Sequence, residues 1–142
     1  MKFIEKIIVS VVSTLIFSIL LAAVEEISVN SLGYFSVELI FVYCIYSFPI
    51  YLIGGGVYSY FVDIYFYKIP IRNWLFKYII GFLLYVVGGL LVIGIILMML
   101  LIVEGKLDDI LITKTFVIGT LASLLFFHVS LVFKKVLKFA AR

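Results

Sequence analysis

Four long apolar blocks without a charged side chain take up more than half of the 142 residues of the chain. They run over residues 7–24, 39–62, 78–103 and 115–133, and their lengths are 18, 24, 26 and 19 residues. A helix that crosses a bilayer needs about 20 mainly apolar residues. Each block is therefore long enough to cross a membrane, and the sequence predicts four spans.

The composition favours a bilayer over water as the solvent of the fold. Hydrophobic residues make up 66% of the chain and charged residues 13%, whereas soluble domains are about half apolar and a quarter charged. Membrane strands alternate apolar and polar residues, but these blocks are apolar on all sides. Helices satisfy their own backbone groups in lipid. We therefore predict an all-α polytopic integral membrane protein, in which residues 1–142 form one compact bundle of four transmembrane helices.

The basic residues are divided unevenly between the segments that flank the blocks. If all four blocks cross the membrane, nine lysines and arginines fall on one side and two on the other. The nine are Lys2, Lys6, Lys68, Arg72, Lys77, Lys134, Lys135, Lys138 and Arg142, and the two are Lys106 and Lys114. Positive residues in short loops mark the cytoplasmic side. We therefore expect a multi-pass protein of the cell membrane with both termini in the cytoplasm.

The connecting segments are short. The first contains the turn formers Asn30 and Gly33, and the second contains Pro70. The third reads EGKLDDILITK over residues 104–114, and we expect it to be a solvated acidic loop. Its acids lack the spacing of a calcium-binding loop, so we expect no metal there.

The second block carries a proline and three consecutive glycines in the stretch FPIYLIGGGVYSYFVD, residues 48–63. Pro49 removes a backbone donor and clashes with the carbonyl four residues earlier. Gly54, Gly55 and Gly56 weaken the helix further. The glycines lie inside a block of full spanning length, unlike a potassium-filter loop, and no GK[ST] follows them, unlike a phosphate loop. The pattern predicts a bent or broken second helix.

A polar and aromatic stripe runs along this second block. On an ideal helix its members fall within about 80° of one another; they are Tyr43, Ser47, Tyr51, Gly54 and Tyr58. We expect the stripe to face the bundle interior or a partner. Because broken helices line substrate cavities in transporters, the stripe could line a small polar cavity. We favour the alternative that the kink serves packing.

Small residues recur at helical spacing on the other blocks, and such residues let helices approach closely in lipid. They are Ser10, Thr14, Ser18 and Ala22 in the first block, Gly81, Gly88, Gly89 and Gly94 in the third, and Thr115, Gly119 and Ser123 in the fourth. We expect these seams to pack the bundle together rather than to form a dimer interface.

Few side chains within the blocks could carry chemistry. Ser59 and Asp63 lie one helical turn apart and could form a hydrogen bond. We expect Asp63 to emerge into the headgroups as a solvated helix end. His128 is an ionisable group within a span, a position that points to function, but we favour a structural role over a proton relay. A single histidine and the single Cys44 exclude a multi-histidine zinc site and an intrachain disulfide.

The hydropathy along the chain, with FPIYLIGGGVYSYFVD followed by a basic loop, resembles uncharacterised four-span membrane proteins of Gram-positive bacteria. The resemblance implies a four-helix membrane fold. It implies no activity or site residue, because such proteins have no assigned activity. Small multidrug transporters also have four short spans, but the embedded glutamate of their first helix has no counterpart among residues 7–24.

The sequence shows no convergent group of acids, bases, nucleophiles or metal ligands, which an enzyme site needs. We therefore expect a non-enzymatic interaction, regulatory, immunity or accessory component without a cofactor or metal. Its expected partners are the lipid bilayer and another membrane protein or a second copy of itself, not nucleic acid. The alternative is a small oligomeric transporter or channel that uses the kinked second helix. The candidate functional or kink positions are Pro49, Tyr51, Gly54, Gly55, Gly56, Ser59, Asp63 and His128.

Overall fold

The computed structural model describes residues 3–29, 37–66, 73–106 and 108–140, and helices occupy nearly all of these ranges. In chain order they are α1 (Phe3–Val29), α2 (Val37–Ile50), η1 (Tyr51–Val57), α3 (Tyr58–Phe66), α4 (Trp74–Glu104) and α5 (Asp109–Ala140). Because α2, η1 and α3 follow one another directly, they form a single span. The predicted all-α fold is confirmed: four helices are long and apolar enough to cross a membrane, and they pack together.

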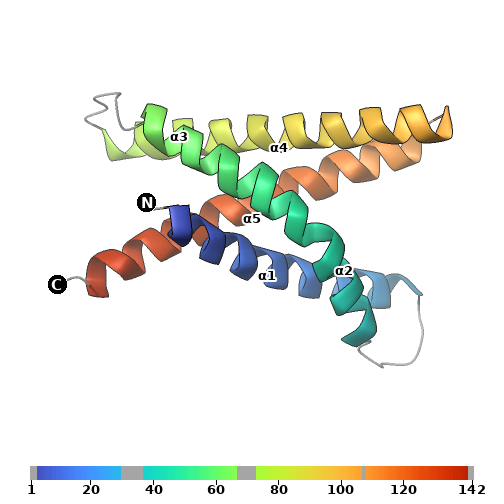
Figure 1. Cartoon of the computed structure of the whole chain (residues 1–142), viewed down its shortest axis with the longest axis horizontal. Coiled ribbons are helices and arrows are strands. Elements are labelled where there is room, and N and C mark those ends of the chain that lie inside the picture. Colours follow the sequence, from blue (N-terminus) through green and yellow to red (C-terminus); the bar gives the residue numbers. More distant parts are fainter. Residues whose placement is uncertain (1–2, 30–36, 67–72, 107, 141–142) are drawn as a thin grey trace.

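The helix ends gather at two opposite ends of the bundle (Figure 1). The start of α1, the end of α3, the start of α4 and the end of α5 lie at one end. We name it the basic end, because its helix termini carry Lys6, Lys77, Lys134, Lys135 and Lys138. The other is named the acidic end, and its helix termini carry Glu25, Glu38, Glu104 and Asp109.

The bundle is closed around η1 and opens toward the acidic end. α1 packs against the second span and α5, α4 packs against α5, and η1 touches α1, α4 and α5. α2 packs mainly on α1, and in Figure 1 it turns away from α4 and α5. Two helix pairs, α1 with α2 and α4 with α5, therefore separate toward the acidic end.

The small-residue seams hold the bundle together as predicted. Ser10, Thr14, Ser18 and Ala22 are all buried in α1. In α4, a Cβ placed on Gly88 would lie 2.4 Å from the Tyr58 ring, so this glycine lets α3 and α4 come close. Gly94 is the exception, because nothing in the described part of the chain comes within 4 Å of a Cβ placed there.

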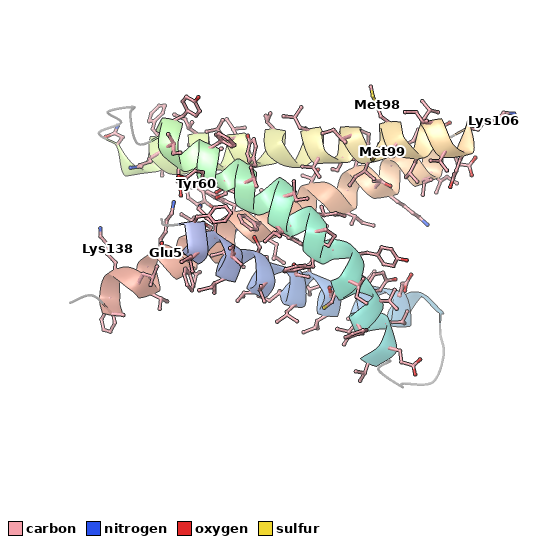
Figure 2. All side chains as sticks on the ribbon, in the orientation of Figure 1. Glu5, Tyr60, Met98, Met99, Lys106 and Lys138 are labelled. Carbon is pink, nitrogen blue, oxygen red and sulfur yellow. The ribbon has the colours of Figure 1, made fainter. Side chains whose placement is uncertain are left out.

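Large apolar side chains cover the outside of the bundle. Met98 and Met99 project from α4 near the acidic end (Figure 2), and both are exposed, as is Ile95 of the same helix. Soluble monomers rarely expose a contiguous apolar surface of this extent. With the hydropathy of the four helices, it identifies a multi-pass membrane protein whose outer surface contacts lipid.

The prediction of a loop over residues 104–114 was wrong for most of that segment, because α5 begins at Asp109. Gly105 caps the end of α4 with a φ of 72°, a left-handed conformation that suits glycine, and its N–H donates to the Leu101 carbonyl at 2.9 Å. Asp109 lies in the first turn of α5, where a negative charge is favoured by the helix dipole.

Charged residues at the helix ends also make the other spans longer than the uncharged blocks. α1 begins at Phe3 and includes Lys6, and α5 continues to Ala140 through the basic segment predicted as a tail. The predicted turn formers Asn30, Gly33 and Pro70 lie outside the described residues.

Candidate functional site

The glycine stretch of the second span forms the π-helix η1 and does not interrupt the helical span. Pro49 lies inside α2, two residues before η1 begins. Ile50 and Tyr58, on either side of η1, keep right-handed helical dihedrals. π-helical turns and prolines are both recognised causes of helix bending. The predicted bend is present in Figure 1, where α2 departs from the line of η1 and α3.

Each of the three glycines faces a different neighbouring span. A Cβ would lie 2.9 Å from Val92 at Gly54, 2.9 Å from Phe126 at Gly55 and 3.1 Å from the Ser10 hydroxyl at Gly56. These neighbours belong to α4, α5 and α1. The glycine run therefore lets η1 lie in the middle of the bundle, close to all three other spans, which supports the packing interpretation of the kink.

An aromatic layer crosses the interior beside η1. The Phe126 ring stacks on Tyr51 at 6.0 Å and on Tyr85 at 6.1 Å between centroids. All three side chains are buried, and the Tyr51 hydroxyl donates to the Ala122 carbonyl at 3.1 Å. The prediction that the stripe faces the interior is confirmed at Tyr51 and at the buried Ser47.

An apolar cleft of about 260 Å³ lies on the acidic-end side of this layer, and all four spans contribute to its walls. Among its lining residues are Ile50, Gly54, Val92, Ile118 and Gly119. The hydroxyls that line it bond within the chain: Tyr58 donates to the Leu84 carbonyl at 2.7 Å, Thr115 to Leu111 at 2.7 Å and Ser123 to Thr120 at 2.9 Å. The Tyr85 hydroxyl bonds Ser59. The stripe thus contributes to an apolar cleft, not to the polar cavity that its residue types suggested.

A charged cluster lies on the basic-end side of the layer. Asp63 forms ion pairs with two lysines: Oδ2 is 2.8 Å from Lys6 Nζ, and Oδ1 is 2.8 Å from Lys134 Nζ. The exposed fractions of the three side chains are 0% for Lys6, 15% for Asp63 and 36% for Lys134. Ser59 bonds both Lys6 and the Tyr85 hydroxyl. Residues from all four spans are therefore linked in one polar chain.

The expectation that Asp63 is a solvated helix end was wrong. The crossing of the spans brings Lys6 of α1 and Lys134 of α5 to its two oxygens, so its charge is compensated inside the bundle. The expected contact between Ser59 and Asp63 is indirect, because Lys6 lies between them. In the sequence, both lysines served only to predict the topology. The signal that could have indicated the cluster is Asp63 itself, an acidic residue among the many basic residues predicted for one side of the membrane.

His128 is not part of this cluster. It is exposed on α5, with Nδ1 2.8 Å from the Leu124 carbonyl and Nε2 3.2 Å from the Tyr78 hydroxyl. A neutral ring with its proton on Nδ1 satisfies both contacts, since it donates to the carbonyl and accepts from the phenol. These contacts support the structural role.

Within the described ranges, no three His, Cys, Asp or Glu side chains are grouped so that they could hold a metal ion, and Cys44 is a free, half-buried thiol. Two features of the described part of the chain that could receive a ligand are the apolar cleft and the charged basic end. The four apolar helices agree with the four-span fold that the sequence resemblance implied. Comparison of the chain with protein-family models, curated proteins and solved structures finds no match, so no family is identified.

Proposed function

We propose that the protein is a non-catalytic membrane component that binds an apolar helix of another membrane protein in the cleft that η1 and the end of α2 form with α4 and α5. The observation that carries this proposal is the apolar cleft itself, whose lining hydroxyls already bond within the chain. Because the protons of these hydroxyls are already donated to carbonyls, a polar solute would find no side-chain donor among them. Apolar side chains would gain dispersion contacts there.

The shape of the bundle supports a helix as the occupant. The cleft is bounded on one side by the aromatic layer, and Ile50 at the end of α2 is among its lining residues. From there α2 turns away from α4 and α5 (Figure 1). Helix association in lipid depends on close packing rather than on a hydrophobic driving force. A partner helix inserted between the two helix pairs would present several side chains of one face to this opening at once.

Site-specific photo-cross-linking tests the proposal. A photoreactive residue at Ile118, which lines the cleft, is expected to form a polypeptide adduct in native membranes. The same residue at Ile95, exposed on α4 outside the cleft lining, is the matched control and should form lipid adducts. Ile118→Trp should fill the cleft and abolish copurification of the cross-linked polypeptide, while Ile95→Trp leaves it intact. Lipid adducts alone at Ile118 would contradict a partner helix.

Transport by a small oligomer is the second candidate, and the charged cluster inside the bundle favours it, because ionisable groups within spans default to function. The aromatic layer of Tyr51, Phe126 and Tyr85 lies between the cluster and the cleft, which supports binding over passage. We expect no solute flux from the purified chain in proteoliposomes. Flux that is lost in Tyr51→Ala would favour transport instead.

We infer that the basic end faces the cytoplasm, because the basic residues concentrate at that end. A reporter fused after residue 142 should therefore be active only when it is of a type that works in the cytoplasm. A reporter fused within the α4–α5 connection should behave in the opposite way. An externally active C-terminal fusion would contradict this orientation.

A further inference from the structure

A second cavity of about 570 Å³ opens at the basic end between the end of the second span, α4 and α5. We name it the basic cavity, because its charged lining residues are one aspartate and four lysines: Asp63, Lys77, Lys134, Lys135 and Lys138. Lys138 lies at this end of the molecule in Figure 2, opposite Lys106 at the acidic end. The lining therefore carries an excess of positive charge.

The single carboxylate cannot neutralise this excess. Asp63 is shared, because Oδ1 binds Lys134 at the cavity and Oδ2 binds Lys6, which is fully buried and does not line the cavity. The negative charge of Asp63 is thus shared between Lys134 and Lys6. Lys135 and Lys138, which also line the cavity, can attract an anion from outside the chain.

On the side of the bundle interior, apolar side chains line the walls of the basic cavity together with Tyr78, Tyr85 and Ser130. Phe127 and Leu131 of α5 and Val62 of α3 contribute to these walls. The lysines come from the first turn of α4 and the last turns of α5, at the ends of the spans where headgroups lie. The cavity thus places ammonium groups next to an apolar wall, a combination that suits an amphiphile with a negatively charged head.

We propose that the basic cavity binds a phosphate group, and that an anionic phospholipid headgroup supplies it. Basic pockets between transmembrane helices on the cytoplasmic side are suited to anionic headgroups. The apolar walls favour a lipid over soluble phosphate, because the first part of an acyl chain can pack against Phe127 and Leu131. This proposal is independent of the cleft and of its partner helix.

The test compares binding of short-chain phosphatidylglycerol and phosphatidylcholine to the purified full chain in a neutral detergent, by titration followed with native mass spectrometry. The wild type is expected to bind phosphatidylglycerol in preference to phosphatidylcholine. The variant Lys135→Gln/Lys138→Gln should lose about fivefold in phosphatidylglycerol affinity for each lysine removed, hence about twenty-five-fold for the pair. Both lysines are exposed, so the fold should persist.

The matched control is Lys106→Gln/Lys114→Gln, which removes the same charge from exposed positions at the acidic end and should leave phosphatidylglycerol binding unchanged. Equal phosphatidylglycerol affinity in the wild type and Lys135→Gln/Lys138→Gln would overturn the proposal. An equal loss in both double variants would overturn it too, since net charge and not the cavity would then be responsible. If inorganic phosphate displaces phosphatidylglycerol at equal concentration, the phosphate site stands but its lipid source is overturned.

Discussion

Replacement of Asp63 by asparagine is expected to destabilise the folded protein by about 3–5 kcal/mol, the usual cost of removing one partner from a buried ion pair. The reason is Lys6, which is fully buried and loses the carboxylate 2.8 Å from its Nζ atom. Unfolding of the purified protein in detergent, followed by circular dichroism or a thermal-shift assay, measures the change. Glu38→Gln at the exposed other end of the same span is the control and should have little effect.

A double-mutant cycle separates this explanation from simple loss of a contact. Lys6→Met alone should cost less than Asp63→Asn, because Asp63 keeps Lys134 at 2.8 Å. Lys6→Met/Asp63→Asn should be more stable than Asp63→Asn alone, because no uncompensated charge then remains buried and Lys134 can reach solvent. Additive effects of the two substitutions would contradict the ion-pair account, since interacting neighbours are expected to be non-additive.

The ion pairs matter more for the arrangement of the spans than for net stability. A buried ion pair recovers only part of the free energy that its desolvation costs. The chain from Tyr85 through Ser59, Lys6 and Asp63 to Lys134 nevertheless links α4, α3, α1 and α5 at the basic end. Other alignments of these helices would leave at least one of the charges without its partner, so the cluster selects one register.

The four spans and their contact faces were predictable because the signals are local. A long uncharged block determines that a helix can cross the membrane, and small residues at helical spacing determine which face a neighbour can approach. The spans predicted from hydropathy were too short, because each predicted span ended at the first charged residue. Lys6 and Asp109 show that charged residues can belong to the terminal turns of a spanning helix.

The charged cluster and the winding of η1 were not predictable, because both depend on residues far apart in the sequence. Asp63 and Lys134 are separated by 71 positions and meet only when α3 and α5 are packed. The glycine run predicted a weak helix. Its π-helical form occurs where the run contacts three different spans. In one of these contacts, the Ser10 hydroxyl of α1 donates to the Tyr51 carbonyl at 3.2 Å. The helical propensity of individual residues does not predict these contacts between distant parts of the chain.

Gly88→Leu is expected to remove most of the folded protein, whereas Gly94→Leu in the same helix should be tolerated. A Cβ at Gly88 would lie 2.4 Å from the Tyr58 ring, closer than any real contact, and nothing described lies within 4 Å of one at Gly94. Overpacking a tight interior usually costs about 1–3 kcal/mol and sometimes more. The yield of monodisperse protein on size-exclusion chromatography in mild detergent measures the difference.

The Tyr58 ring cannot easily move away from a larger residue at position 88. Its hydroxyl donates to the Leu84 carbonyl at 2.7 Å, and its ring packs edge-to-face with Tyr85 with centroids 6.2 Å apart. Tyr58→Ala should therefore restore part of the yield lost in Gly88→Leu, because the new side chain then fills the volume that the ring vacates. Equal yields for Gly88→Leu and Gly94→Leu would show that α3 and α4 do not pack closely through Gly88.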